Sequence, residues 1–323
     1  MSIDLHAQKL SGPTMGTEWR AEIGVLANTD MAALEKALAD AVALVDNQMS
    51  SWKPESDLMR LNAAPLGEWV ETPPELMQVL ARGLEIGRLS GGAFDIGLGD
   101  LITAWGFGST PPNEADIRAK LSQPRPDTVE ALELDQANAR ARKHAPLALD
   151  LSGIAKGYGV DRMMQICENF GLGSALVVLD GEVRSKGVQP NGKPWAVAIE
   201  KPDYTARTPF SMLELHDAAV ATSGDYRHWV QVGQSRLSHS MDRQKGGPVQ
   251  PEIASVTVVA ADCMTADAMA TAILVQGVKN GSAFARNQRL DCLILERGVD
   301  GIVPHGVGTL FSRPPNKPAP VPA

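Results

Sequence analysis

The sequence predicts an α+β fold in which mixed or antiparallel sheets are flanked by helices. In the first half, two long segments carry apolar residues at three- and four-residue steps, the spacing of an amphipathic helix. The second half is richer in short runs typical of strands, separated by Gly, Pro and Asp turns. These runs do not alternate regularly with helical segments, so the order disfavours a doubly wound parallel sheet.

Helical periodicity is clearest over residues 31–49, where Thr29 or Asp30 would cap the amino-terminal end. A second helix is expected to begin at Thr72, as a capping box with proline in the first turn, and to stop at the glycine pair 91–92. Further helices are predicted over about 153–170 and 265–276, with a surface loop and short helix over 109–127.

The strand predictions rest on alternating or continuous apolar runs bounded by turn residues. No internal repeat accompanies them. The predicted strands are 18–25, 175–179, 195–199, 218–222, 255–260 and 293–296.

Composition limits the possible classes of protein. A chain of 323 residues, 44% hydrophobic and 21% charged, suits one large or two medium soluble domains. A formal net charge of −8 argues against nucleic acid as a partner, and the short basic run at 140–144 is interpreted as a solvated turn.

No stretch of the sequence approaches the ~20 apolar residues of a transmembrane segment. The cysteines Cys167, Cys263 and Cys292 are expected to be buried and unpaired.

The first residues of the sequence lack the basic and apolar regions of a signal peptide. As the sequence stands this favours a cytoplasmic location, whereas removal of a leader would make the protein periplasmic.

Residues 146–158 are the most informative segment. An apolar run brings Asp150 to a tight turn at Ser152 and Gly153, after which a helical pattern opens with Lys156 in its first turn. A carboxylate, free backbone N–H groups and a cation therefore surround one strand-to-helix corner. Such a corner holds anionic ligands. Its spacing matches neither a dinucleotide fingerprint nor a Walker loop.

This segment resembles the D-L-S-x-I-A-K-G-Y-x-V-D block of the ApbE family, the FAD:protein FMN transferases. Other blocks of the chain resemble that family's motifs in the same order, and the ordered combination is far more specific than any one block. The resemblance extends from about residue 11 to 277, through 11–17, 49–62, 92–99, 105–108, 180–187, 221–226, 238–248 and 265–271.

The chain departs from the family's motifs at three places. Trp52 stands where tyrosine is frequent, Asp180 where glycine is common, and Arg243 where the family has proline. In the block around Asp180, Glu182 and Arg184 are interpreted either as a structural ion pair supporting a hairpin or as ligand contacts.

Taken alone, Met15 and Trp52 offer polarizable or flat surfaces for a ring system, or simply pack in the core. The resemblance implies that both contact FAD, with Trp52 beside the isoalloxazine. It implies an ApbE-like fold with FAD in a cleft between two subdomains. The residues it assigns to FAD binding are Met15, Trp52, Ala93, Phe94, Asp95, Asp150, Lys156 and Met241.

Asp267 and Thr271 lie four residues apart on a predicted helix, so their oxygens share one face. Alone, the segment suggests a helix cap, with Thr265 as the capping residue. A carboxylate, a hydroxyl and a backbone carbonyl also suit Mg²⁺. The resemblance implies the second interpretation, with Asp267, Thr271 and the carbonyl of Gly153 as metal ligands.

Catalytic candidates are His239 and Asp267. His239 suits proton transfer near an acceptor hydroxyl, because imidazole titrates near neutral pH. The base stays open between His239, Asp267 and Asp150. In the block 221–226, small residues and Asp225 could also line the site.

The resemblance implies Mg²⁺-dependent transfer of FMN from FAD to a threonine of an acceptor flavoprotein, with release of AMP. A FAD pyrophosphatase and a non-catalytic flavin-binding assembly factor are the alternatives. The implied organisation is an amino-terminal extension over 1–10, a catalytic domain over 11–312, possibly in two subdomains, and a proline-rich disordered tail over 313–323.

Overall fold

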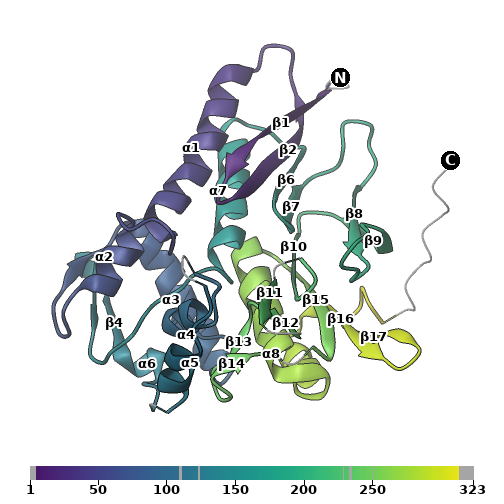
Figure 1. Cartoon of the computed structure of the whole chain (residues 1–323). Helices are drawn as coiled ribbons and strands as arrows, with labels where there is room; N and C mark the ends of the chain where they lie inside the picture. Colours follow the sequence, from purple (N-terminus) through teal and green to yellow (C-terminus); the bar gives the residue numbers. More distant parts are fainter. Residues whose placement is uncertain are drawn as a thin grey trace.

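A computed structural model describes residues 5–108, 111–122, 124–227, 229–232, 235–249 and 251–312. Its centre is an eight-stranded sheet in the order β1-β2-β6-β7-β10-β15-β16-β17, and every neighbouring pair is antiparallel (Figure 1). The predicted α+β class is confirmed. The strands are β1 (His6–Thr14), β2 (Thr17–Val25), β6 (Ala175–Leu179), β7 (Glu182–Lys186), β10 (Ala219–Gly224), β15 (Ile253–Ala260), β16 (Asp291–Gly298) and β17 (Gly301–Val307).

Helices α1 (Met31–Met49), α7 (Ala155–Asn169) and α8 (Cys263–Asn287) pack on one face of this sheet, with α7 between the other two. The hairpin of β8 (Trp195–Glu200) and β9 (Pro209–Leu215) covers the opposite face through Trp195, Leu213 and Leu215. Figure 1 shows α1 and α7 side by side and the β8–β9 hairpin across the sheet from them. The sheet is therefore buried on both faces.

Most of the chain between α1 and α7 forms a smaller helical part beside the lower end of α1 (Figure 1). It holds a three-stranded antiparallel sheet in the order β3-β5-β4. Its elements are α2 (Asp57–Ala63), β3 (Val70–Glu71), α3 (Pro74–Leu89), α4 (Gly99–Ala104), α5 (Glu114–Leu121), α6 (Thr128–Ala131), β4 (Leu132–Asp135), the 3₁₀ turn Gln136–Asn138 and β5 (Arg140–Lys143). Two small hairpins follow later in the chain, β11 (Trp229–Val232) with β12 (Ser235–Ser238) and β13 (Met241–Asp242) with β14 (Gly247–Pro248).

One hydrophobic cluster joins the helical part to the sheet, because Leu58, Leu80, Tyr158, Ile273 and Ile294 belong to it together. A second cluster fills the space between α1, α7 and the strands β2 and β6. The two parts thus share a core, and a division into two subdomains stays a prediction.

The predicted helices are found with small shifts. Asp30 caps α1 by accepting from the N–H of Ala33, and the helix predicted at 265–276 is the first half of α8, which kinks at Gly277. The capping box at Thr72 is wrong. The Thr72 hydroxyl donates instead to the carbonyl of Val70, and α3 has no side-chain cap.

Residues 6–10 do not form a separate extension. They are the first half of β1, which pairs along its whole length with β2. The β1–β2 turn is Met15-Gly16, both with positive φ (47° and 73°), the geometry of a tight two-residue hairpin. Residues 1–4, three positions of the predicted 109–127 insertion and the predicted disordered tail 313–323 lie outside the described residues.

The three cysteines are buried and unpaired, as predicted. Across the described ranges, no helix is both long and apolar enough to span a bilayer.

Candidate active site

The strand-to-helix corner predicted at 150–156 is present. The N–H of Asp150 donates to Ile96, the Asp150 carboxylate accepts from the N–H of Ser152, and α7 begins at Ala155. The helix has no side chain of its own capping its first turn. The positive end of the helix dipole lies at this corner and favours a negative charge beside it.

Asn62 holds this corner in place from α2. Its amide oxygen accepts from the N–H of Leu149 at 2.7 Å, and its amide nitrogen donates to the carbonyl of the same residue at 2.9 Å. The buried ammonium of Lys143 donates to the Asn62 carbonyl. The motif block ending at Asn62 thus fixes the residue before Asp150, a role that sequence reasoning missed.

Asp267 and Thr271 lie on α8 facing the same corner. The Asp267 carboxylate accepts from the N–H of Gly157 at 3.1 Å, and a Cβ at Gly157 would lie 2.4 Å from the carbonyl oxygen of Cys263. Only glycine permits so close a helix contact. The Thr271 hydroxyl contacts the Ser223 hydroxyl at 2.9 Å. The amino-terminal turns of α7 and α8 therefore meet at Asp267.

The space beside Gly153 bears on whether a hard cation fits here. A Cβ there would lie 3.3 Å from both Thr271 Oγ1 and Phe94 Cε2, so any side chain would fill the space beside Thr271. No three His, Cys, Asp or Glu side chains cluster as a metal site in the described part of the chain. A cation here would use one carboxylate with hydroxyl and carbonyl oxygens, a set that suits Mg²⁺.

The start of α8 is fixed by two carboxylates. Asp262 caps it by accepting from the N–H of Thr265, so the alternative interpretation with Thr265 as the capping residue is wrong. Asp161 accepts from the N–H groups of Cys263 and Met264, both at 2.9 Å, and pairs with Arg184 at 2.6 Å. Arg184 is thus paired with Asp161 on α7 rather than with Glu182.

Lys156 projects into a cluster of carboxylates. Its ammonium lies 3.0 Å from Glu182, which is almost fully buried, and 3.2 Å from Asp180. Burial alone would lower the pKa of Lys156, but Glu182, Asp267 and Asp180 raise it above its usual value. Lys156 therefore stays protonated at physiological pH.

Asp267 is a carboxylate of this cluster, and its pKa is influenced by Lys156. Burial, and after it the nearby Glu182 carboxylate, raises the pKa of Asp267, while Lys156 and the Gly157 N–H act in the opposite direction. A bound divalent cation would favour the ionised form, because it adds positive charge beside the carboxylate.

The predicted FAD-binding residues Ala93, Phe94 and Asp95 follow α3 in a short loop. The N–H of Phe94 donates to the Ser90 hydroxyl, and the Phe94 ring edge lies next to Gly153. The Asp95 side chain is only 5% exposed. Burial raises the pKa of Asp95, although hydrogen bonds from Thr128 and Gly97 and the charge of Arg243 lower it. This loop therefore lies directly beside the corner.

A cavity of about 330 Å³ opens on the other side of this loop. The walls come from α3, the loop 91–96, residues 127–129 and Arg243. Phe94 contributes to this cavity and also faces Gly153. The walls of this cavity contain none of the predicted metal ligands Gly153, Asp267 and Thr271. A FAD-binding cleft between two subdomains therefore stays a prediction.

The segment of His239 and Met241 packs against α4 and the residues after it. The Met241 side chain is buried with Leu98 and Leu101, and the His239 ring stands edge-on to Phe107 with 6.4 Å between the ring centroids. Met241 thus packs the segment in place. Its contact with flavin and the proton-transfer role of His239 both stay predictions.

Met15 and Trp52 differ in their surroundings. Met15 is half-buried and packs against both large clusters, as the core interpretation expected. Trp52, in the turn after α1, is 62% exposed, which contradicts core packing. Its indole is therefore accessible to a planar ligand.

The block 221–226 divides between two roles. Ser223 reaches Thr271, whereas Asp225 turns away and pairs with Arg297 at 2.6 Å. Sequence reasoning offered the small residues of this block and Asp225 as lining the site. Of these, Ser223 contacts Thr271, whereas Asp225 follows the end of β10 and pairs elsewhere.

The fold is that of solved flavin transferases. The flavin transferase ApbE from Vibrio cholerae superposes with a TM-score of 0.83 at 31% identity, covering 94% of this chain and 97% of that one. The ApbE protein from Thermotoga maritima gives 0.82 at 29% identity, covering 95% and 100%.

Sequence comparison agrees with the structural likeness. The family model described as "ApbE family" matches residues 15–294. The FAD:protein FMN transferase of Vibrio cholerae is 34% identical over 90% of this chain and 88% of its own, and that of Klebsiella pneumoniae is 31% identical over 91% and 86%. The chain belongs to the ApbE family.

Proposed function

We propose that this protein is a FAD:protein FMN transferase, which moves the FMN part of FAD onto a threonine of an acceptor flavoprotein. The observation that carries the proposal is the meeting of the α7 and α8 amino-terminal turns at Asp267, beside Gly153 and Thr271. An anionic substrate is favoured there by the positive end of the α7 dipole and by the protonated Lys156.

The reaction is a phosphoryl transfer. The threonine oxygen of the acceptor attacks the phosphorus of the FMN part, and an O–P bond forms. The bond from that phosphorus to the bridging oxygen of the pyrophosphate breaks, and AMP leaves with both electrons of that bond. The hydroxyl proton passes to a base or to water. Such reactions depend mainly on positioning and on stabilising charge at the phosphate.

We place Mg²⁺ on Asp267, Thr271 and the Gly153 carbonyl. When bound, Mg²⁺ neutralises charge on the pyrophosphate and on the leaving AMP. Thr271 can coordinate a cation through a lone pair only if its proton points elsewhere, and the Ser223 hydroxyl at 2.9 Å offers an acceptor for it.

The remaining residues bind and orient FAD. Lys156 contributes a fixed positive charge, because Glu182 and Asp180 hold its ammonium on one side. Trp52 offers an exposed ring for stacking on the isoalloxazine. Asp150 orders the Ser152-Gly153 turn through its carboxylate. His239 and Asp267 are the proposed proton acceptors for the threonine hydroxyl.

The test is incubation of the protein with FAD, Mg²⁺ and a threonine-bearing flavoprotein, with mass spectrometry of the acceptor and measurement of AMP. A transferase gives equal amounts of AMP and of FMN-bearing acceptor, and gives no adduct when the target threonine is replaced by alanine. AMP with free FMN and no adduct would identify a FAD pyrophosphatase. Bound FAD with no product would identify a flavin carrier.

A further inference from the structure

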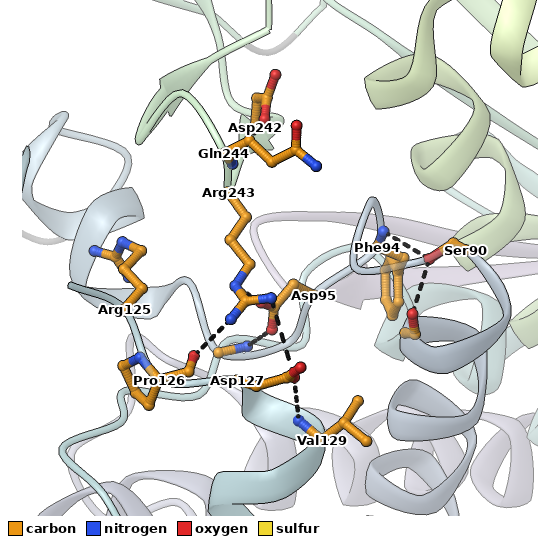
Figure 2. Close-up of polar contacts among 12 residues, drawn as sticks. Ser90, Phe94, Asp95, Arg125, Pro126, Asp127, Val129, Asp242, Arg243 and Gln244 are labelled. Carbon is orange, nitrogen blue, oxygen red and sulfur yellow. Dashed lines mark hydrogen bonds and ion pairs between the residues drawn. The ribbon is translucent and has the colours of Figure 1, made fainter.

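Arg243 joins three segments that are distant in sequence. Its Nε lies 3.2 Å from the Asp95 carboxylate, and its Nη2 donates to the Pro126 carbonyl at 2.9 Å. Its Nη1 lies 4.0 Å from Asp127. Figure 2 shows the side chain reaching from the β13–β14 turn, beside Asp242 and Gln244, to these three groups.

The ion pair with Asp95 is more than a surface contact. The Asp95 side chain is 5% exposed and that of Arg243 is 23% exposed, so water screens the pair weakly. A buried carboxylate needs a partner charge or several hydrogen bonds to remain ionised. Arg243 supplies the charge, and the Gly97 N–H supplies a hydrogen bond at 2.8 Å.

The two segments that this pair connects both carry predicted flavin contacts. One is the loop with Ala93, Phe94 and Asp95, and the other is the segment with His239 and Met241. Arg243 ties the second segment to the first through its ion pair with Asp95, in addition to the packing of Met241 against α4 and the contact of His239 with Phe107. Arg243 and Asp95 also form part of the wall of the 330 Å³ cavity.

We propose that Arg243 is a positioning residue for FAD, which fixes the Asp95 carboxylate and holds the β13–β14 turn, next to Met241, against the loop 93–95. This inference rests on the proposed function, because it assumes that the loop contacts FAD. Arg243 acts through Asp95 and not by touching the reacting phosphate. Its loss should therefore weaken FAD binding and leave the chemical step largely intact.

The experiment measures FAD affinity by flavin fluorescence, together with kcat and KM for FMN transfer, in Arg243→Met, Asp95→Asn and the double variant. Methionine keeps the packing of the aliphatic stem and removes the guanidinium, with its charge and its N–H donors to Asp95 and Pro126. We expect about tenfold weaker FAD binding for Arg243→Met, a coupling of the size found for contacting residues, with kcat within about threefold. The double variant should bind FAD no more weakly than Asp95→Asn alone.

Arg243→Lys distinguishes the loss of the positive charge from a general folding defect. Its ammonium can still pair with Asp95 and should recover most of the FAD affinity. Arg125→Met is the matched control, since Arg125 lies nearby and pairs with Asp100 at 2.9 Å (Figure 2 labels Arg125). We expect wild-type FAD affinity in that control.

Unchanged FAD affinity in Arg243→Met, or losses that add fully in the double variant, would overturn the inference while the wild type still transferred FMN. A wild-type protein that bound no FAD would instead overturn the proposed function.

Discussion

At the scale of single residues, Ser223 and Thr271 form the contact on which the proposed metal site most depends. Because a coordinated hydroxyl must direct its proton away from the cation, Ser223→Ala should leave the Thr271 proton without its acceptor. We expect about tenfold weaker Mn²⁺ binding, the usual effect of losing a group that orients a metal ligand. Titration of Mn²⁺ by electron paramagnetic resonance, in the presence of FAD, measures this directly.

Thr222→Ala is the matched control for that titration. Thr222 is the neighbour of Ser223 on β10 and makes a similar hydroxyl contact, at 2.8 Å with Thr257, on the other side of the strand. Equal losses of Mn²⁺ affinity in the two variants would show that Ser223 acts only through the stability of the strand.

Trp52 gives a second test at this scale. Its indole is exposed, so Trp52→Ala removes little core packing. If the ring stacks on the isoalloxazine, the variant should bind FAD more weakly by about 1–3 kcal/mol with an almost unchanged melting temperature. Wild-type affinity, measured by flavin fluorescence, would exclude the stacking role. Trp69, whose ring lies against the guanidinium groups of Arg140 and Arg142, offers the control Trp69→Ala.

At the scale of elements, the position of α8 depends on the acceptors at its first turn. Asp161→Asn keeps the shape of the side chain but removes its charge from Arg184 and weakens its bonds to Cys263 and Met264. We expect a loss of about 1–3 kcal/mol in the free energy of unfolding, from the usual cost of losing charge-assisted hydrogen bonds. Urea denaturation measures it.

Asp116→Asn, on the exposed helix α5, is the control and should change the free energy of unfolding by less than about 0.5 kcal/mol. If Asp161→Asn unfolded at the same urea concentration as the wild type, Asp161 would not be what fixes the start of α8.

Some features of the candidate site could be predicted from the sequence alone, and others could not. The corner at Asp150 and the helix pairing of Asp267 with Thr271 were predictable, because each depends on short spacings within one segment. Asn62, Asp161 and Arg243 were not, because each acts on a segment far away in the chain. The cap at Thr72 failed because a local contact with Val70 competed for the hydroxyl.

At the scale of the whole molecule, the shared hydrophobic cluster fixes the helical part against α8 and the sheet. The site residues come from both parts, with Phe94 from the helical part and Thr271 from α8 meeting at Gly153. This convergence could not be read from the sequence, since the strand order of the sheet brings β10 beside β15 and α8 across both. The likeness to solved flavin transferases covers both parts.

The most direct test of the account is a crystal structure of the protein with FAD and Mn²⁺, with the metal located by its anomalous scattering. We expect one Mn²⁺ bound by Asp267, Thr271 and the Gly153 carbonyl, the pyrophosphate of FAD at the start of α7, and the isoalloxazine beside Trp52. Manganese bound elsewhere, or FAD seated away from the corner 150–156, would contradict it.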